Sequence, residues 1–295
     1  MIPKIIHQIW YQDNSTNNFN INYVSIPSQF KNTVKKLINI NPEYKYYFWN
    51  NINIKLFIKK YYPEFYKLFL DCKFMIQRID LAKYLIIYHY GGFYIDMDCE
   101  PIKNLNQFLN KFKNHKLLYV SRTPKFNNLE NYVIKLMYNF KTDNYFINNG
   151  IIISPKKHDF LKYLLKNIPK YMYNNKDYFY NSIVFNTFGP SSFTNLIIKY
   201  KKGIYILENK YFEPCYGKDI KCSVDKETIL FHQHRSLWIK NKDYSNFLIN
   251  FIINNFFNII SKVVTINYFT FLRGYTPLYI ILIILIYKKN NHSNL

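Results

Sequence analysis

The sequence predicts an α/β fold built on a mostly parallel central sheet, with apolar helices added at the C-terminal end. Short apolar segments typical of buried strands recur along the chain, and segments with helical spacing of apolar residues separate them. The chain has 295 residues, of which 49% are hydrophobic, and this is enough for one sizeable core with a small appendage. We therefore expect one domain over residues 1–240 and an apolar tail over residues 241–295.

The first part of the domain alternates apolar strands with helices. Strands are expected at residues 4–10 and 44–49, and helices at residues 29–40, 54–61 and 64–71. Asn41-Pro42 and Pro63 mark two of the helix boundaries, because proline cannot continue a helix.

Residues 74–90 form the clearest helix of the chain, since apolar residues repeat along it at intervals of three and four. Gly91-Gly92 ends this helix, because a glycine just past a helix end accepts the required backbone conformation at little cost. Residues 93–95 then predict a short buried strand that emerges at Asp96-Met97-Asp98.

The second part of the domain continues the alternation. Strands are expected at residues 117–121, 151–154, 204–207 and 228–232, and helices at residues 160–168 and 191–200. Asn148-Asn149-Gly150 is expected to precede the strand at 151–154, either as a turn or as a group of hydrogen-bonding side chains. Ser191-Ser192 is expected to cap the helix that it opens. Alternation of this kind favours a mostly parallel sheet.

The tail contains two apolar segments, residues 247–260 and 275–287. The second has thirteen residues, whereas a membrane span needs about 20. It suits an interfacial or re-entrant segment or a helix packed on the domain, and we favour attachment to a membrane surface. Residues 1–10 lack the apolar stretch of a signal peptide, so the domain is expected to be cytosolic and membrane-associated. The residue bias, typical of an A/T-rich genome, leaves a viral or host membrane compartment open.

The chain is strongly basic, with 40 basic and 18 acidic residues and a formal net charge of +22. The basic residues are scattered, and the longest runs are pairs such as Lys35-Lys36. This distribution argues against a nucleic-acid partner. A basic field also suits a small anionic molecule or an anionic lipid surface.

Asp96 and Asp98 are the strongest candidates for a functional site. They follow an apolar strand, and the alternation of side chains along a strand would place both carboxylates on one face. Two adjacent carboxylates repel each other, so a bound cation best explains the pair. Oxygen ligands suit Mg²⁺ or Mn²⁺, and such a metal can stabilise a diphosphate as it leaves.

Asp80 and Lys83 lie one turn apart on the preceding helix and face the same way. They form either a surface ion pair or a part of the site, in which Asp80 binds ribose or sugar hydroxyls and Lys83 meets phosphate. Trp10, after the first strand, either stacks on a nucleobase or is a core aromatic residue. Asn148 and Asn149 are candidates for hydrogen bonds to sugar hydroxyls near the reaction centre.

A late segment, residues 232–238, adds further candidates. His232 and His234 alternate onto one face after a strand, and a histidine there can complete the coordination of a metal. Ser236 and Trp238 are expected to cover the diphosphate as a lid.

The runs IQRIDLAKY, at residues 76–84, and GGFYIDMD, at residues 91–98, resemble glycosyltransferase family 32, whose members carry a DXD sugar-binding motif. The family includes initiating α-1,6-mannosyltransferases and inositol phosphorylceramide mannosyltransferases. The opening segment, residues 2–10, resembles its first strand. Three later segments resemble further blocks of the family, in the same order along the chain: Asn148-Asn149-Gly150, Gly189-Pro190 and residues 232–238. The resemblance covers residues 1–240.

The resemblance implies a GT-A fold of Rossmann-like type, a Mn²⁺-dependent nucleotide-sugar donor and retention of anomeric configuration. By position, Asp96 and Asp98 bind metal and diphosphate, and Asp80 binds the donor. The family usually has Arg where this chain has Lys83, which keeps the charge but loses the bidentate fork. We expect transfer of a hexose, mannose from GDP-mannose, to a glycan or glycolipid acceptor, with Asn148 or Asn149 near the anomeric centre.

Two alternatives stay open. One is glucosyl or galactosyl transfer to a protein, as in related toxin domains. The other is a non-enzymatic basic protein that binds a membrane or nucleic acid, which would show salt-sensitive DNA binding without nucleotide-sugar binding.

Overall fold

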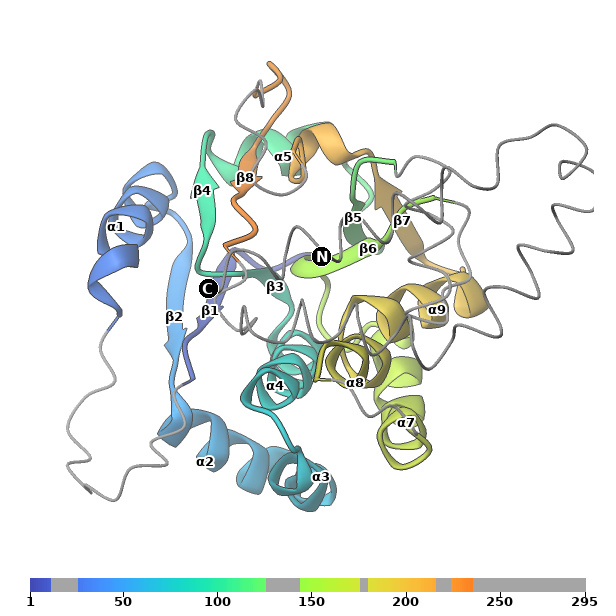
Figure 1. The fold of residues 1–295 in the computed structure, drawn as a ribbon. Coiled ribbons are helices and arrows are strands. Elements are labelled where there is room, and N and C mark those ends of the chain that lie inside the picture. The colour runs from blue at the N-terminus through green and yellow to red at the C-terminus, as the bar shows by residue number, and fades with distance from the viewer. Residues whose placement is uncertain (12–25, 126–143, 176–179, 216–223, 236–295) are drawn as a thin grey trace, which may run out of the picture. The chain divides into compact units, whose positions relative to one another are not determined.

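A six-stranded sheet forms the centre of the domain in the computed structural model, which describes residues 1–11, 26–125, 144–175, 180–215 and 224–235 (Figure 1). In the order in which they lie across the sheet, its strands are β2 (Lys45–Trp49), β1 (Ile5–Ile9), β3 (Gly92–Ile95), β6 (Ile147–Ser154), β5 (Leu118–Arg122) and β7 (Ile204–Leu207). The described residues belong to one compact unit, Met1–Ile239.

The sheet is mostly parallel, as predicted. β1 pairs in parallel with both β2 and β3, and β5 pairs in parallel with β7. β6 runs antiparallel to both of its neighbours, β3 and β5. Because β6 alone is reversed among these strands, its first residues lie beside the carboxyl ends of the others.

Helices and a small ribbon cover the two faces of the sheet (Figure 1). One face packs against α2 (Asn51–Tyr61), α3 (Tyr66–Asp71), α4 (Met75–Tyr90), α7 (Asp159–Tyr173) and α9 (Pro190–Tyr200), and α8 (Tyr180–Thr187) packs on α9. The other face packs against α1 (Lys31–Ile40), α5 (Leu105–Lys111) and the segments around β4 (Cys99–Pro101) and β8 (Leu230–His232). Short 3₁₀ helices are η1 (Ser28–Phe30), η2 (Pro63–Phe65) and η3 (Asn209–Tyr211).

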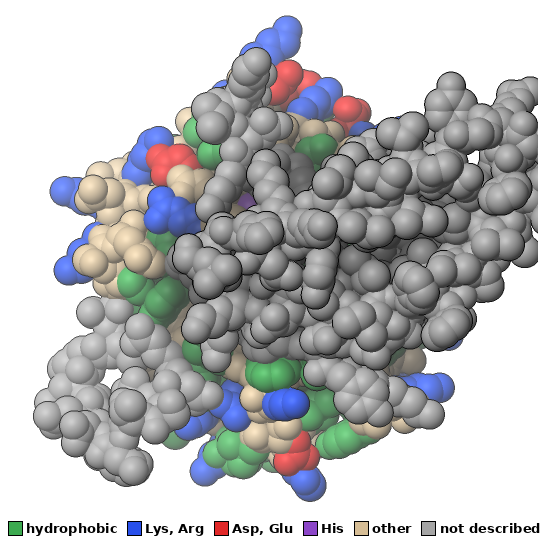
Figure 2. Space-filling model, viewed as in Figure 1, with side chains coloured by type: hydrophobic (Ala, Val, Ile, Leu, Met, Phe, Trp, Pro, Cys, Tyr) green, Lys and Arg blue, Asp and Glu red, His purple; other side chains and the backbone are tan. Residues whose placement is uncertain are grey.

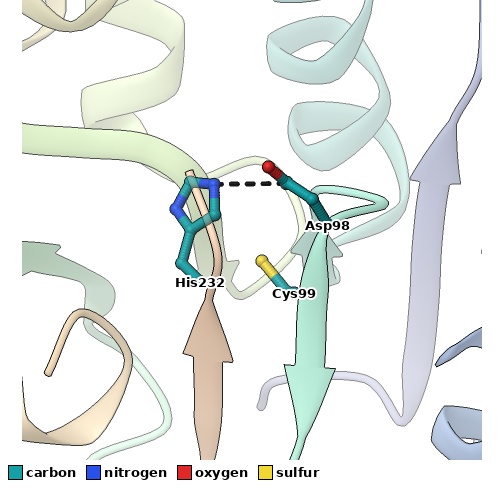
Figure 3. Close-up of side chains that lie close together, drawn as sticks. All are labelled: Asp98, Cys99 and His232. Atoms are coloured by element: carbon teal, nitrogen blue, oxygen red, sulfur yellow. Dashed lines mark ion pairs between the residues drawn. The ribbon is translucent and has the colours of Figure 1, made fainter. Parts of the chain in front are cut away.

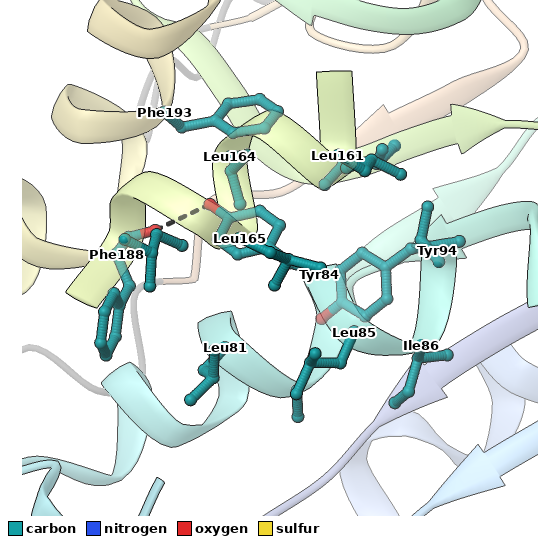
Figure 4. Packing of buried hydrophobic residues seen from close by; sticks show 14 of the residues in the cluster. Leu81, Tyr84, Leu85, Ile86, Tyr94, Leu161, Leu164, Leu165, Phe188 and Phe193 are labelled. Carbon is teal, nitrogen blue, oxygen red and sulfur yellow. Dashed lines mark hydrogen bonds between the residues drawn. The ribbon is translucent and has the colours of Figure 1, made fainter. Parts of the chain in front are cut away.

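The alternation of side chains along the central strands divides the core into two clusters. Tyr94 and Ile152 belong to the cluster under α4, and Phe93 and Ile153 belong to the cluster on the α5 face. Figure 4 shows the first cluster, in which side chains of α4 meet those of α7 and the hydroxyl of Tyr84 donates a hydrogen bond to the carbonyl of Phe188. The core thus fixes α4 against the sheet beside the end of β3.

Gly91 ends α4, as the sequence predicts, and its φ is 67°. A Cβ at this position would lie 2.6 Å from the backbone nitrogen of Lys156, a distance that side chains do not adopt. Both the positive φ and the close approach therefore require glycine, and they bring the chain directly from α4 into β3.

Several predicted boundaries are wrong. Asn148-Asn149-Gly150 does not precede a strand but lies within β6, since the pairing with β5 continues to Ile147. α7 continues through Pro169 to Tyr173 instead of ending before the proline. α9 begins at Pro190 with no side-chain cap, and Ser192 donates to the carbonyl of Gly189 instead.

Other elements differ from the prediction or were not predicted. β8 was expected in the alternating series, but it pairs antiparallel with β4 in a separate two-stranded sheet. β4, α5 and α8 were not predicted. α2 begins three residues earlier than expected because Asn50 caps it by accepting from the backbone nitrogens of Ile52 and Asn53.

The expected tail, residues 241–295 with its apolar helices, lies outside the described residues. Within the part of the chain that the structure describes, no helix has the length and apolar character needed to cross a membrane. Figure 2 shows Lys and Arg side chains in several separate places on the described part of one face. This agrees with the scattered distribution of basic residues along the sequence.

Candidate active site

The reversed direction of β6 brings Asp96 and the asparagines of β6 together. Ile95 at the end of β3 pairs with Ile151, and the backbone nitrogen of Asp96 donates to the carbonyl of Gly150 at 2.8 Å. Asn148 and Asn149 are the next residues toward the start of β6. Polar side chains that lie far apart in the sequence therefore meet at the carboxyl edge of the parallel strands, where α/β proteins bind ligands.

The β4–β8 ribbon brings His232 to Asp98. In its register Cys99 is opposite His232, so Asp98 lies one residue from the paired position. Nε2 of His232 lies 3.2 Å from Oδ1 of Asp98, and Figure 3 shows the two side chains with Cys99 below them. Arg235 donates its backbone N–H to Oδ2 of Asp98 at 2.9 Å. Both carboxylate oxygens of Asp98 are thus held by the end of β8 and the residues that follow it.

Gly150 lets Asp96 and His232 approach each other. A Cβ on Gly150 would lie 2.7 Å from Oδ2 of Asp96 and 2.8 Å from Cε1 of His232. The missing side chain therefore leaves the space that these two groups occupy. The strand ends at Ile95, so the turn after it, and not strand alternation, places both aspartates near one imidazole.

Asp80 and Lys83 form a buried ion pair beneath Asp96, and the alternative of a surface pair is wrong. Nζ of Lys83 lies 2.8 Å from Oδ1 of Asp80 and 3.8 Å from Oδ1 of Asp96, and the side chains of Lys83 and Asp80 are 3% and 4% exposed. Asp80 also accepts from Nδ2 of Asn149, and Asp96 accepts from the hydroxyl of Tyr94 at 2.5 Å. One buried ammonium therefore lies between two carboxylates.

The pKa values of Asp80 and Lys83 are shifted by burial and by each other's charge. Burial raises the pKa of Asp80 to about 6, against the opposing effect of Lys83. Burial alone would lower the pKa of Lys83, but Asp80 and Asp96 raise it above its usual value. Lys83 thus stays charged. Burial raises the pKa of Asp96, and Lys83 and His232 oppose this rise by stabilising the ionised carboxylate.

Glu213 is a part of the site that the sequence did not predict. Its side chain is fully buried, Oε1 lies 3.0 Å from Nδ1 of His232, and Oε2 lies 2.6 Å from Nε2 of His234. Its only signal in the sequence is a lone acidic residue in the apolar run Tyr211-Phe212-Glu213-Pro214. A buried carboxylate needs such partners, because an unpaired buried charge costs several kcal/mol.

The charges of Asp98, His232 and Glu213 stabilise one another. Burial raises the pKa of a carboxyl group, yet His232 holds the pKa values of both Asp98 and Glu213 below their usual range. Burial alone would lower the pKa of His232, but Glu213 and Asp98 raise it well above its usual value. The imidazole position is therefore one where positive charge is strongly favoured.

Comparisons with known proteins give the family of the chain. The family model described as the glycosyltransferase sugar-binding region containing DXD motif matches residues 27–118. An uncharacterized glycosyltransferase of Acanthamoeba polyphaga mimivirus is 32% identical over 224 residues, which cover 73% of this chain and 74% of that protein. The chain belongs to the DXD glycosyltransferases of family 32.

Two further similarities accompany this assignment. Inositol phosphoceramide mannosyltransferase 2 of Schizosaccharomyces pombe is 29% identical over 204 residues, which cover 68% of this chain and 48% of that enzyme. The chain thus spans about half the length of this relative. The apo structure of mouse xyloside xylosyltransferase 1 superposes with a TM-score of 0.48 at 9% identity, over 81% of this chain and 100% of that one. Family membership decides for an enzyme and against the non-enzymatic alternative.

Two groups of side chains in the described part of this glycosyltransferase have ligand atoms close enough to share a metal ion. They are Asp98 with Cys99 and His232, and Glu213 with His232 and His234. Burial raises the pKa of the Cys99 thiol well above its usual value, and sulfur is a softer ligand than Mg²⁺ or Mn²⁺ prefers. Asp96 belongs to neither group, but 29% of its side chain is exposed and its Oδ2 lies beside the His232 ring.

The remaining predicted residues occupy different places in the glycosyltransferase. Trp10 packs edge-on against Phe30 and contacts the small cluster that contains Met97. Asn148 points toward His232, with Nδ2 3.1 Å from Nδ1, and its Oδ1 accepts from the nitrogen of Gly150. Asn149 points to the opposite face, where its Nδ2 donates to Asp80 and to the hydroxyl of Tyr84. Ser236 and Trp238 lie outside the described residues.

Proposed function

We propose that this glycosyltransferase is a metal-dependent retaining hexosyltransferase of the GT-A type. The observation that carries the proposal is the meeting of Asp96, Asp98 and His232 at the carboxyl edge of the sheet, with Asp98 and His232 3.2 Å apart. Two carboxylates and an imidazole at such an edge suit a divalent cation and the diphosphate of a nucleotide-sugar.

The donor set fits Mn²⁺ or Mg²⁺ on the grounds of its chemistry. Carboxylate oxygens are the ligands that both ions prefer, and an imidazole favours Mn²⁺ of the two. Nδ1 of His232 faces the carboxylate of Glu213, so Nε2 is the nitrogen presented to Asp98. Asp96, Asp98 and His232 would hold the metal, which when bound neutralises charge on the leaving diphosphate.

The residues of the chain supply binding and charge around this position. Lys83 is buried under Asp96 and compensates part of its charge, and His232 holds the pKa of Asp98 below its usual range. Asp80 binds the donor in our proposal, and its carboxylate is fixed by Lys83 and Asn149. Asn148 is better placed than Asn149 to meet a sugar, since Asn148 lies beside His232 and both amide hydrogens of Asn149 have buried partners.

The remaining donor contacts are proposals from the sequence. Trp10 borders the cluster that contains Met97 of the DXD run, which supports a contact with the nucleobase. Ser236 and Trp238 continue the segment that wraps Asp98, and we propose that they cover the diphosphate. Transfer proceeds through an oxocarbenium-like state on the donor face.

The sugar, the acceptor and the location are proposed from the relatives and the tail. We propose mannose from GDP-mannose as the donor and a glycan or glycolipid as the acceptor, supported by the printed name of the fission yeast relative. The apolar segments at residues 247–260 and 275–287 support attachment to a membrane, and we propose a cytosolic catalytic domain in a host or viral compartment.

A donor panel tests this function. The purified full chain is incubated with GDP-mannose, UDP-glucose and UDP-galactose, each with Mn²⁺ and with a chelator, and free nucleotide is measured. We expect metal-dependent hydrolysis of GDP-mannose above the other two. Preferred hydrolysis of UDP-glucose or UDP-galactose would replace the donor proposal with glucosyl or galactosyl transfer.

A further inference from the structure

Glu213 joins two histidines through one buried carboxylate. The residue follows η3, and its backbone nitrogen donates to the carbonyl of Asn209, which fixes it at the end of that turn. The side chain has no exposed surface, and each carboxylate oxygen faces a different ring, His232 at 3.0 Å and His234 at 2.6 Å. A carboxylate with both oxygens used in this way is an anchor for two side chains at once.

For His232 this anchor decides which nitrogen faces the DXD aspartates. The carboxylate of Glu213 can only accept, so the Nδ1 proton of His232 is directed to it. Nδ2 of Asn148 lies 3.1 Å from the same nitrogen, but an amide nitrogen donates and does not accept. The amide is held in this orientation because its Oδ1 accepts from the N–H of Gly150. Nε2 of His232 is left pointing at Asp98. A carboxylate that holds the outer nitrogen of a metal-ligating histidine fixes both its tautomer and its orientation.

The same carboxylate directs the ring of His234 away from Asp98. Its Nε2 lies 2.6 Å from Glu213, and its ring stacks on that of His232 with centroids 4.0 Å apart. His234 also has a positive φ of 48°, which turns the chain so that Arg235 donates its backbone N–H to Asp98. The ring of His234 is therefore used to hold the segment after β8, and it faces Glu213 and not Asp98.

We propose that Glu213 is a positioning residue that presents His232 to the metal, and that His234 is its second anchor point and not a metal ligand. The proposal rests on the proposed metal-dependent function. It divides the two histidines of the sequence between two roles, coordination for His232 and retention of residues 232–235 against Asp98 for His234.

The test measures metal binding by the full chain without any sugar. Mn²⁺ affinity is determined by titration calorimetry, and Co²⁺ is added as a spectroscopic probe whose visible bands report ligand geometry. Glu213→Gln keeps the size of the side chain but removes the charge that holds the Nδ1 proton. We expect Mn²⁺ affinity to fall about 10- to 100-fold and the Co²⁺ bands to shift, while the melting temperature shows that the variant is folded.

Two further variants make the result specific. Glu227→Gln makes the same chemical change in a glutamate that pairs with Lys111 and Lys210 at the surface, and it should leave Mn²⁺ affinity and the Co²⁺ bands unchanged. His234→Gln should weaken Mn²⁺ binding much less than Glu213→Gln does and should leave the Co²⁺ bands in place.

Three outcomes would overturn these assignments, and they differ from one another. Wild-type affinity in a folded Glu213→Gln variant contradicts the positioning role. A Co²⁺ spectrum altered by His234→Gln, with a large loss of affinity, makes His234 a ligand. Absence of Mn²⁺ and Co²⁺ binding by the wild-type chain would instead remove the metal-dependent function on which the inference rests.

Discussion

Nε2 of His232 lies 3.2 Å from Oδ1 of Asp98, although one residue follows β3 and the other ends β8. The antiparallel pairing of Cys99 with His232 produces this contact, and Glu213 fixes the other side of the ring. The metal-binding role that we propose for the DXD run thus depends on a ribbon that pairs two distant segments of the chain.

Replacing His232 should impair catalysis without unfolding the domain. His232→Ala removes the imidazole that we propose as the third protein ligand, so metal-dependent transfer should fall by about 100-fold or more, the usual effect of removing one stabilising group from a polar site. Rates are measured at several Mn²⁺ concentrations, and excess Mn²⁺ should restore part of the activity. His115→Ala, in the loop after α5, serves as the control and should behave like wild type. Equal rates for the two variants would exclude His232 as a ligand.

Gly150→Ala should disturb the site more than the fold. The added Cβ would meet Oδ2 of Asp96 and Cε1 of His232, and overpacking of this kind costs about 1–3 kcal/mol. We expect transfer and Mn²⁺ binding to be nearly lost. Ile151→Val, one residue further along β6, costs about 1 kcal/mol but leaves the site intact, so it should retain activity. Full activity of Gly150→Ala would show that Asp96 and His232 need not approach each other.

Lys83→Met should destabilise the domain strongly. It leaves Asp80 and Asp96 without their shared cation, and breaking a buried pair in this way costs about 3–5 kcal/mol. The double variant Asp80→Asn/Lys83→Met removes one of the uncompensated charges and should recover part of the loss. Free energies of unfolding from urea titrations complete the double-mutant cycle. Additive effects of the two single changes would contradict a coupled pair.

His7 should make stability depend on pH. The ring is buried, Trp49 donates to its Nδ1 and its Nε2 donates to the carbonyl of Gly91, so the fold requires the neutral form. Burial lowers its pKa from 6.5 to about 4. Between these values the unfolded chain binds a proton that the folded chain does not. The contribution of neutral His7 to the free energy of unfolding is therefore complete above pH 6.5 and is lost by pH 4. This is a change of about 3 kcal/mol.

The variant His7→Gln isolates this effect from other titrating groups. The difference in unfolding free energy between wild type and variant should shrink as pH falls from 7 to 4. A difference that stays constant over this range, or an NMR titration of His7 near pH 6.5, would contradict the buried neutral ring.

Periodic patterns predicted most of the sheet and its helices. α4 and β3 were predictable because apolar spacing, Gly91 and a short apolar run all agree locally. β4 and β8 have only three residues each, and their pairing depends on distant segments, so no local pattern reveals it. Asn148-Asn149-Gly150 has the composition of a turn, but pairing with β5 extends the strand through it to Ile147.

The candidate site was predicted in part for the same reason. The DXD run and the late histidines were visible as motifs, yet the contact between Asp98 and His232 comes from the ribbon. Lys83 is typical of an exposed helix position, and only the approach of Asp96 and Asp80 permits its burial. Glu213 has no motif around it, because its role depends on where the two histidines fall in space.

The most direct test of the account is transfer by the Asp98→Asn variant, compared with wild type in the presence of Mn²⁺ and of a chelator. The amide keeps an acceptor for the N–H of Arg235 but loses the charge that a metal requires. We predict that wild type hydrolyses and transfers from GDP-mannose only with Mn²⁺, and that a folded Asp98→Asn variant does neither. A fully active Asp98→Asn enzyme, or wild-type activity that persists in chelator, would contradict the central claim.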